Sequence, residues 1–210
     1  MELEVKIKES YQEYVLEHGQ QPASVFAFAR NLGIPEVVFY AHYNSFNAIE
    51  KEIWKLFFDR TLVRLESNEV YAQYSVREKL LSFYYTWIEE LKADRSFVVY
   101  SLKRSTHRSA GTPPQLMGFK KAFLAYAREL LAEGLESKEV VYRPLLSERY
   151  ADGVWVQLTF VLNFWVTDES KNFEKTDEVI EKAVNTSFDL MGPLPVDSVV
   201  DFAKFLYRNW

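Results

Sequence analysis

The residue types that could perform catalysis are scattered along this chain. Its three histidines, His18, His42 and His107, lie far apart, and it has no cysteine to act as a nucleophile, form a disulfide or hold a metal. It also has no HExxH or GxSxG motif and no phosphate-binding glycine loop. Since nothing assembles a nucleophile, a base and an orienting group, the sequence predicts no enzyme, no metal site and no cofactor.

Aromatic side chains that could bind apolar molecules are, by contrast, abundant. The 210 residues include 16 phenylalanines, 13 tyrosines and 5 tryptophans. Rings of this size bury large areas and commonly line cores, interfaces and pockets for apolar ligands. A hydrophobic content of 48% is enough to bury a sizeable core, as one large domain or as one small and one medium domain.

The elements that must position these side chains are predicted to be helices. Glycine and proline number only seven each, which favours long helices over a turn-rich β fold. Apolar residues recur at helical spacing, Gly33 and Gly134 are expected breaks, and Ser45 can cap a long helix. We expect helices at 3–18, 23–32, 35–41, 45–67, 75–93, 96–107, 115–134, 145–168, 174–191 and 196–209.

No segment has the pattern of a membrane span or a signal peptide. The first ten residues are charged and lack an apolar core. The most apolar stretch, residues 154–166, is too short to cross a bilayer and contains Gln157 and Asn163. We therefore expect a cytoplasmic protein, with residues 154–166 as a buried interface helix.

The opening quarter has the spacing of a helix-turn-helix, with three short predicted helices before a long one. Small, apolar and aromatic residues fall there in one ungapped register: Gly19, Ser24, Val25, Phe28, Ala29, Gly33, Tyr40, Tyr43 and Ile49. This register resembles that of the TetR family of transcriptional regulators, as do the chain length and the helical remainder. The same positions also specify a three-helix core, with a positive φ at Gly33, whatever the function.

The resemblance implies an all-α, TetR-like fold and a set of partners. A three-helix head would span residues 1–50, and a body of six or seven helices for ligand binding and dimerisation would span 51–210. The partners would be a second copy, paired through the C-terminal helices, double-stranded DNA, and a small apolar or amphipathic ligand. The head residues placed to contact DNA are Ser24, Pro35, Glu36, Val37, Val38, Tyr40, His42, Tyr43 and Ser45.

The head departs from the family where phosphates and base edges are contacted. The recognition helix usually opens with Ser, Lys or Arg, and Thr, but here it reads Pro35, Glu36, Val37 and Val38. Phe46 stands where a lysine usually opens the fourth helix. Residues 1–54 carry a net charge of −4, whereas tight DNA binders neutralise about six to ten phosphates. Two hypotheses follow: a ligand-responsive regulator, or a TetR fold that has lost DNA binding and holds a lipophilic ligand or a protein partner.

The body offers candidates for a ligand pocket and for a dimer interface. In a TetR-like body the ligand lies among the middle helices, although an aromatic stripe at helical spacing belongs more often to a core than to a ligand pocket. Arg104 could pair with a ligand carboxylate or could complement the end of its helix. The pocket candidates are Tyr84, Trp87, Phe97, Tyr100, Arg104, Tyr126 and Trp155. The interface candidates are Trp155, Leu158, Leu162, Trp165, Ile180, Val184 and Phe188.

Overall fold

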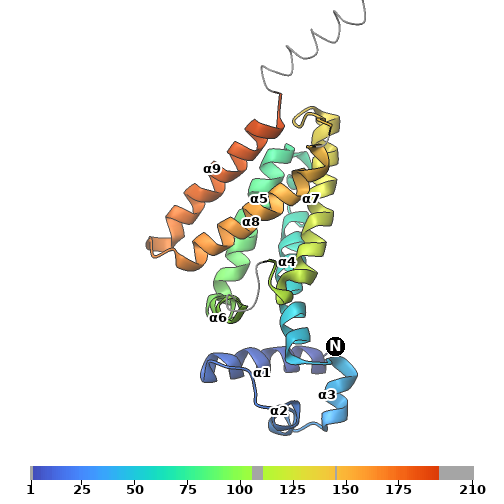
Figure 1. The fold of residues 1–210 in the computed structure, drawn as a ribbon, viewed down its shortest axis with the longest axis vertical. Coiled ribbons are helices and arrows are strands. Elements are labelled where there is room, and N and C mark those ends of the chain that lie inside the picture. The colour runs from blue at the N-terminus through green and yellow to red at the C-terminus, as the bar shows by residue number, and fades with distance from the viewer. Residues whose placement is uncertain (1, 106–110, 145, 194–210) are drawn as a thin grey trace, which may run out of the picture. The chain divides into compact units, whose positions relative to one another are not determined.

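A computed structural model describes residues 2–105, 111–144 and 146–193, and every regular element within these ranges is a helix (Figure 1). The all-α prediction is therefore confirmed. The α-helices are α1 (Glu2–His18), α2 (Val25–Leu32), α3 (Glu36–His42), α4 (Phe46–Glu66), α5 (Val76–Ala93), α6 (Arg95–Ser105), α7 (Met117–Ser137), α8 (Tyr150–Thr167) and α9 (Glu174–Met191). Short 3-10 turns are η1 (Tyr71–Gln73), η2 (Pro114–Leu116), η3 (Ser147–Arg149) and η4 (Lys171–Phe173).

Capping residues mark both ends of α2 and the beginning of α4. Ser24 Oγ accepts a hydrogen bond from the backbone N–H of Ala27 at 3.1 Å, and Ser45 Oγ accepts one from Ala48 at 3.2 Å. Gly33 has a φ of 70°, and its N–H donates to the carbonyl of Arg30, which closes α2. The predicted roles of Gly33 and Ser45 are confirmed.

Two predicted boundaries in the later helices were wrong. Helix α7 continues through Gly134 to Ser137, because this glycine provides room rather than a stop. A Cβ atom at position 134 would lie 2.8 Å from Val140 Cγ2, so the glycine allows the next segment to pack closely. Helix α8 begins at Tyr150 rather than at 145, after the turn η3. The predicted helix at 196–209, and the end of the one at 96–107, lie outside the described residues.

Internal contacts divide the chain into two compact units, one of residues 1–63 and 87–122 and one of residues 64–86 and 123–210. Helices α4, α5 and α7 each contribute residues to both. This grouping places α6 with α1–α3, so it differs from a head at 1–50 and a body at 51–210. That functional division stays a prediction.

The first unit holds the three short helices around one aromatic interior. Phe28 of α2 is buried, and its ring makes edge contacts with Tyr11, Phe39 and Phe46 at centroid distances of 5.4–6.3 Å. Phe46 also stacks on Tyr11 at 5.5 Å. These rings come from α1, α2, α3 and α4, so the predicted helix-turn-helix shares a single core.

The second unit is centred on the pairing of α8 with α9. Gln157 of α8 donates to the carbonyl of Ala183 on α9 at 2.5 Å and accepts from the Tyr84 hydroxyl at 3.0 Å. Trp155 of α8 packs on Phe123 of α7 at a centroid distance of 6.0 Å. The apolar length of α8 is thus largely covered within the chain, as expected for a helix that is apolar on most sides.

The turn between α8 and α9 is organised by the carboxylate of Asp168. It accepts hydrogen bonds from Ser170 N–H at 2.8 Å, Thr176 N–H at 3.0 Å and Thr176 Oγ1 at 2.6 Å. Within this turn Asn172 and Phe173 adopt φ values of 54° and 64°, a region that costs most residues about 1–2 kcal/mol. Burial acts to raise the pKa of Asp168, but the hydrogen bonds from Thr176 and Ser170 outweigh it and lower that pKa to about 2.

We expect Asp168→Asn to lower the free energy of unfolding by about 1.5–3 kcal/mol at pH 7, because hydrogen bonds to a charged acceptor are lost. Because the pKa of Asp168 is lower in the folded protein than its ordinary value of 3.8, the ionised carboxylate stabilises the fold fully at pH values above 3.8. This stability is lost as the pH falls toward 2. Urea unfolding at pH 7 and pH 3 should therefore show a smaller difference between wild type and variant at pH 3. The exposed neighbour Glu169, changed to Gln, is the control, and an equal difference at both pH values would contradict this account.

Candidate functional site

The outward face of α3, the predicted recognition helix, is apolar. Val37 is 73% exposed and Tyr40 is 48% exposed, while Glu36 and Val38 are half-buried and Pro35 is exposed at the N-cap of the helix. Apolar side chains could contact thymine methyl groups and a tyrosine hydroxyl could reach a phosphate, but neither supplies a cation. The surface that would face DNA therefore lacks the basic side chains that usually neutralise phosphates.

The remaining predicted DNA contacts differ in their availability. The hydroxyls of Ser24 and Ser45 accept helix-capping bonds and keep their own hydrogens for donation. His42 is exposed at the end of α3 and lies 3.2 Å from Glu4. Tyr43, however, is only 4% exposed, and burial raises the pKa of its phenol. Tyr43 is thus part of the interior rather than of the surface.

The few basic residues of this region are partly engaged by neighbours within the first unit. Lys8 pairs with Glu52 at 2.6 Å, and the Arg30 guanidinium lies 5.8 Å from the centre of the Phe26 ring. Phe46, at the position of the family's lysine, contributes its ring to the aromatic interior instead. The contacts of these side chains therefore do not compensate for the net negative charge of residues 1–54.

A buried carboxylate, Glu50 of α4, joins three helices of the first unit. It is 0% exposed and accepts hydrogen bonds from Tyr11 Oη of α1 at 2.5 Å, Ser101 Oγ of α6 at 3.1 Å and Arg104 of α6 at 2.9 Å. Gln21, in the segment before α2, adds a bond at 3.2 Å. We call these residues, Tyr11, Gln21, Glu50, Ser101 and Arg104, the Glu50 cluster. Because a charge in this position must be paired, the cluster ties α6 to α1 and to the helix-turn-helix.

Arg104 was predicted as a ligand contact or as a solvated helix end, and the structure gives it a different role. Its side chain is 24% exposed and is held by Glu50 and, at 3.0 Å, by Asn47. The sequence contained one signal for this pairing: Glu50 lies on the stripe of α4 that also carries Ile53, Trp54 and Phe57, all of which are buried. An acid on an apolar stripe needs a partner.

The other predicted pocket residues are divided between the two units. Trp87 and Phe97 are fully buried in the first unit, where the Trp87 ring stacks on Phe119 at 5.1 Å. Tyr100, on the same unit, is half-buried. Tyr84, Tyr126 and Trp155 belong to the second unit, in which Tyr84 and Trp155 are buried and Tyr126 shares a hydrogen bond with Tyr71 at 2.8 Å. The pocket itself stays a prediction.

The predicted dimer residues are buried within one chain. Exposures are 5% or less at Trp155, Leu158, Leu162, Trp165, Ile180, Val184 and Phe188. They cover the inner faces of α8 and α9, so they cannot also form the surface of these helices. The exposed apolar side chains are instead Val156 and Phe160 of α8, at 64% and 56%, and Leu190 of α9, at 63%.

An apolar hollow of about 460 Å³ adjoins Leu190 at one end of α8 and α9. It is lined by Arg143, Leu146, Arg149, Tyr150, Gly153, Val154, Ser187, Leu190 and Met191. Over the described ranges, no group of three or more His, Cys, Asp or Glu side chains could hold a metal ion, and no helix is long and apolar enough to cross a membrane.

Comparison with known proteins identifies the family of the chain. Residues 79–206, more than half of its length, match the family described as "Tetracyclin repressor-like, C-terminal domain". The search of curated proteins found no match.

Three solved structures share the fold at low sequence identity. A protein of unknown function from Rhodococcus sp. RHA1 is 13% identical with a TM-score of 0.58, covering 91% of this chain and 96% of its own. The TetR family transcriptional regulator PfmR from Thermus thermophilus is 20% identical with a TM-score of 0.53, covering 85% and 97%. The fatty acid degradation regulator FadR from Bacillus halodurans is 19% identical with a TM-score of 0.58, covering 85% and 96%. With its all-helical fold, its helix-turn-helix around Gly33 and its matched C-terminal region, the chain belongs to the TetR family of transcriptional regulators.

Proposed function

We propose that the protein is a dimeric transcriptional regulator that binds DNA through α2 and α3 and responds to a small lipophilic ligand in its body. The arrangement of α2 and α3 in the head is the observation that supports this proposal most strongly. Gly33 makes the turn, Phe28 fills a core shared by four helices, and the core leaves Val37 and Tyr40 of α3 pointing outward. A lipophilic ligand is favoured by the aromatic content and by the similar fold of a fatty acid degradation regulator.

One specific observation favours the second candidate, a TetR fold that no longer binds DNA. The outward face of α3 carries valine, tyrosine and glutamate, and residues 1–54 have a net charge of −4. Affinity for DNA depends largely on the release of counterions by basic side chains. A protein of this kind would use its body to bind a lipophilic ligand or another protein.

Titration of the protein against its own upstream DNA at low salt separates the two candidates. If α3 enters the major groove, we expect sequence-selective binding with a nanomolar Kd and a salt dependence that reports fewer than about six phosphate contacts. Tyr40→Ala should then weaken binding at least tenfold, with fluorescence anisotropy as the readout. The matched control is Leu16→Ala on α1, which is equally exposed at 48%. No binding below about micromolar concentration would favour the second candidate.

The dimer in this proposal pairs the exposed faces of α8 and α9. Val156 and Phe160 are four residues apart and lie on one side of α8, while Leu190 lies near the end of α9. Large apolar side chains gathered on helices that pack together are typical of an interface between copies. The covered faces of the same helices hold the unit's own core.

We expect Phe160→Glu to convert a dimer into a monomer, because it places a charge in an apolar contact made twice across a two-fold axis. Sedimentation equilibrium over a concentration series is the measurement. Val63→Glu, on an α4 side chain that is 67% exposed, is the control and should leave the dimer intact. A variant at position 160 that still dimerises with wild-type affinity would overturn this choice of face.

In this proposal a movement of α6 would be transmitted to α1 through the hydrogen bonds of the Glu50 cluster. We expect Arg104→Met to lower the free energy of unfolding by about 3 kcal/mol, because a buried carboxylate loses its cation. Glu50→Gln combined with Arg104→Met should cost less than the sum of the single changes, since the double variant buries no unpaired charge. Urea unfolding of the four proteins in this cycle measures the coupling, and strict additivity would show that the pair does not act as a unit.

A further inference from the structure

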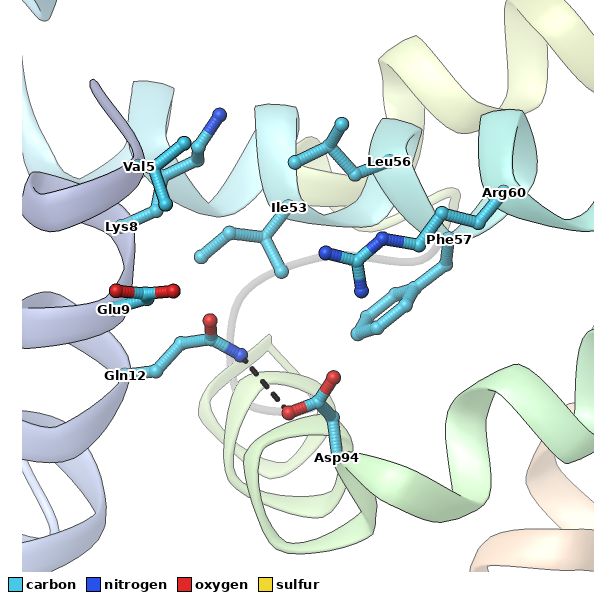
Figure 2. Close-up of a pocket in the computed structure, with 9 residues that line it drawn as sticks. All are labelled: Val5, Lys8, Glu9, Gln12, Ile53, Leu56, Phe57, Arg60 and Asp94. Carbon is cyan, nitrogen blue, oxygen red and sulfur yellow. Dashed lines mark hydrogen bonds between the residues drawn. The ribbon is translucent and has the colours of Figure 1, made fainter. Parts of the chain in front are cut away.

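A hollow with a volume of about 170 Å³ lies between α1 and α4 in the first unit (Figure 2). Helix α1 contributes Val5, Lys8, Glu9 and Gln12, α4 contributes Ile53, Leu56, Phe57 and Arg60, and the turn before α6 contributes Asp94. This volume is smaller than the roughly 300–1,000 Å³ of pockets that hold drug-sized ligands. It suits a small organic molecule rather than a long lipid.

The floor of the hollow is apolar and its rim is charged. Ile53 and Phe57 are 3% and 1% exposed, and Leu56 beside them is half-buried. Figure 2 shows the Arg60 guanidinium reaching over Phe57 toward the space, with Asp94 facing it from the α6 side. A ligand here would meet an apolar surface and groups of both charges.

The rim charges are left largely without partners in the part of the chain that the structure describes. Arg60 and Glu9 make no hydrogen bond or ion pair there, so none joins Arg60 to Asp94 across the hollow. The Asp94 carboxylate accepts one long bond, from Gln12 at 3.4 Å. Lys8 is already engaged by Glu52. A cation and an anion therefore flank the same apolar floor with capacity for further hydrogen bonds.

We propose that this hollow binds a small zwitterion with an apolar side chain, of which a free α-amino acid such as leucine or phenylalanine is the simplest case. The carboxylate would pair with Arg60, the ammonium group would pair with Asp94 beside Glu9, and the side chain would lie on Ile53, Leu56 and Phe57. A simple carboxylic acid would pair with Arg60 but would leave the acids of the rim without a cation. A simple amine would pair with those acids but would leave Arg60 without an anion. None of the residues that line the hollow is a candidate for the ligand pocket of the body, and the proposed binding does not depend on DNA.

Isothermal titration calorimetry of the full chain tests the site with chemically matched probes. We expect L-phenylalanine and L-leucine to bind with a Kd on the order of 10 µM to 1 mM, within the range that small ligands reach. Two probes lack one charge each, 3-phenylpropionate without the ammonium group and 2-phenylethylamine without the carboxylate. Glycine lacks the apolar side chain. All three should bind at least tenfold more weakly than L-phenylalanine.

Two substitutions connect the binding to the named side chains. Arg60→Gln and Asp94→Asn should each weaken binding of L-phenylalanine at least tenfold. Since Arg60 is exposed and makes no hydrogen bond or ion pair among the described residues, Arg60→Gln should leave the Tm unchanged and so keep the test valid. Arg64→Gln, one turn further along α4, is the matched control and should bind as wild type does.

Three results would overturn the proposal. One is the absence of heat for every amino acid up to about 10 mM, roughly ten times the weakest Kd expected above. Another is equal affinity for L-phenylalanine and for either singly charged probe. The third is unchanged binding in the Arg60 and Asp94 variants. Because none of these measurements includes DNA, they stand apart from the outcome of the operator titration.

Discussion

The carboxylate of Glu50 is removed from solvent, and this places the strongest constraint on the first unit. Removing an ion from water costs several kcal/mol, which is recovered only when its donors are all in place. These donors come from α1, from the segment before α2 and from α6, that is, from residues up to 54 positions away. The folding of the helix-turn-helix is therefore coupled to that of α6. A displacement of α6 would alter the hydrogen bonds that Glu50 makes with Tyr11.

The aromatic interior of the head and its scarcity of basic side chains are linked at Phe46. Phe46 occupies a position that a lysine holds in the family, and its ring stacks on Tyr11 and meets Phe28. The Tyr11 hydroxyl in turn donates to Glu50. The ring at position 46 thus adds packing to the core, where a lysine would add a positive charge to the head. Stability of the head and affinity for a polyanion are opposed at this residue.

The helices could be predicted because their signals are local. Contacts between residues far apart in the sequence could not be predicted in the same way. Gly33 and Ser45 act on backbone groups three or four residues away, so their roles could be deduced from spacing alone, whereas the N-cap role of Ser24 was missed because the second helix was predicted to begin at 23. The pattern predicted a helix end at Gly134, because nothing in the spacing shows that Val140, which follows the helix, packs against this glycine. The covered face of α8 could not be deduced, since apolar residues surround most of the helix and its inner side is set by packing against α9 and α7. The bond between Glu50 and Arg104 joins residues 54 positions apart, and no periodicity encodes it.

The exposure of α3 has a consequence for how such a protein can change. Phe39 anchors this helix in the core, while Val37 and Tyr40 project from it without serving that core. Residues on such a face can be exchanged at little cost in stability. The side chains on this face can therefore change while Phe39 and the rest of the core keep the head folded, which leaves the surface chemistry of α3 free to diverge.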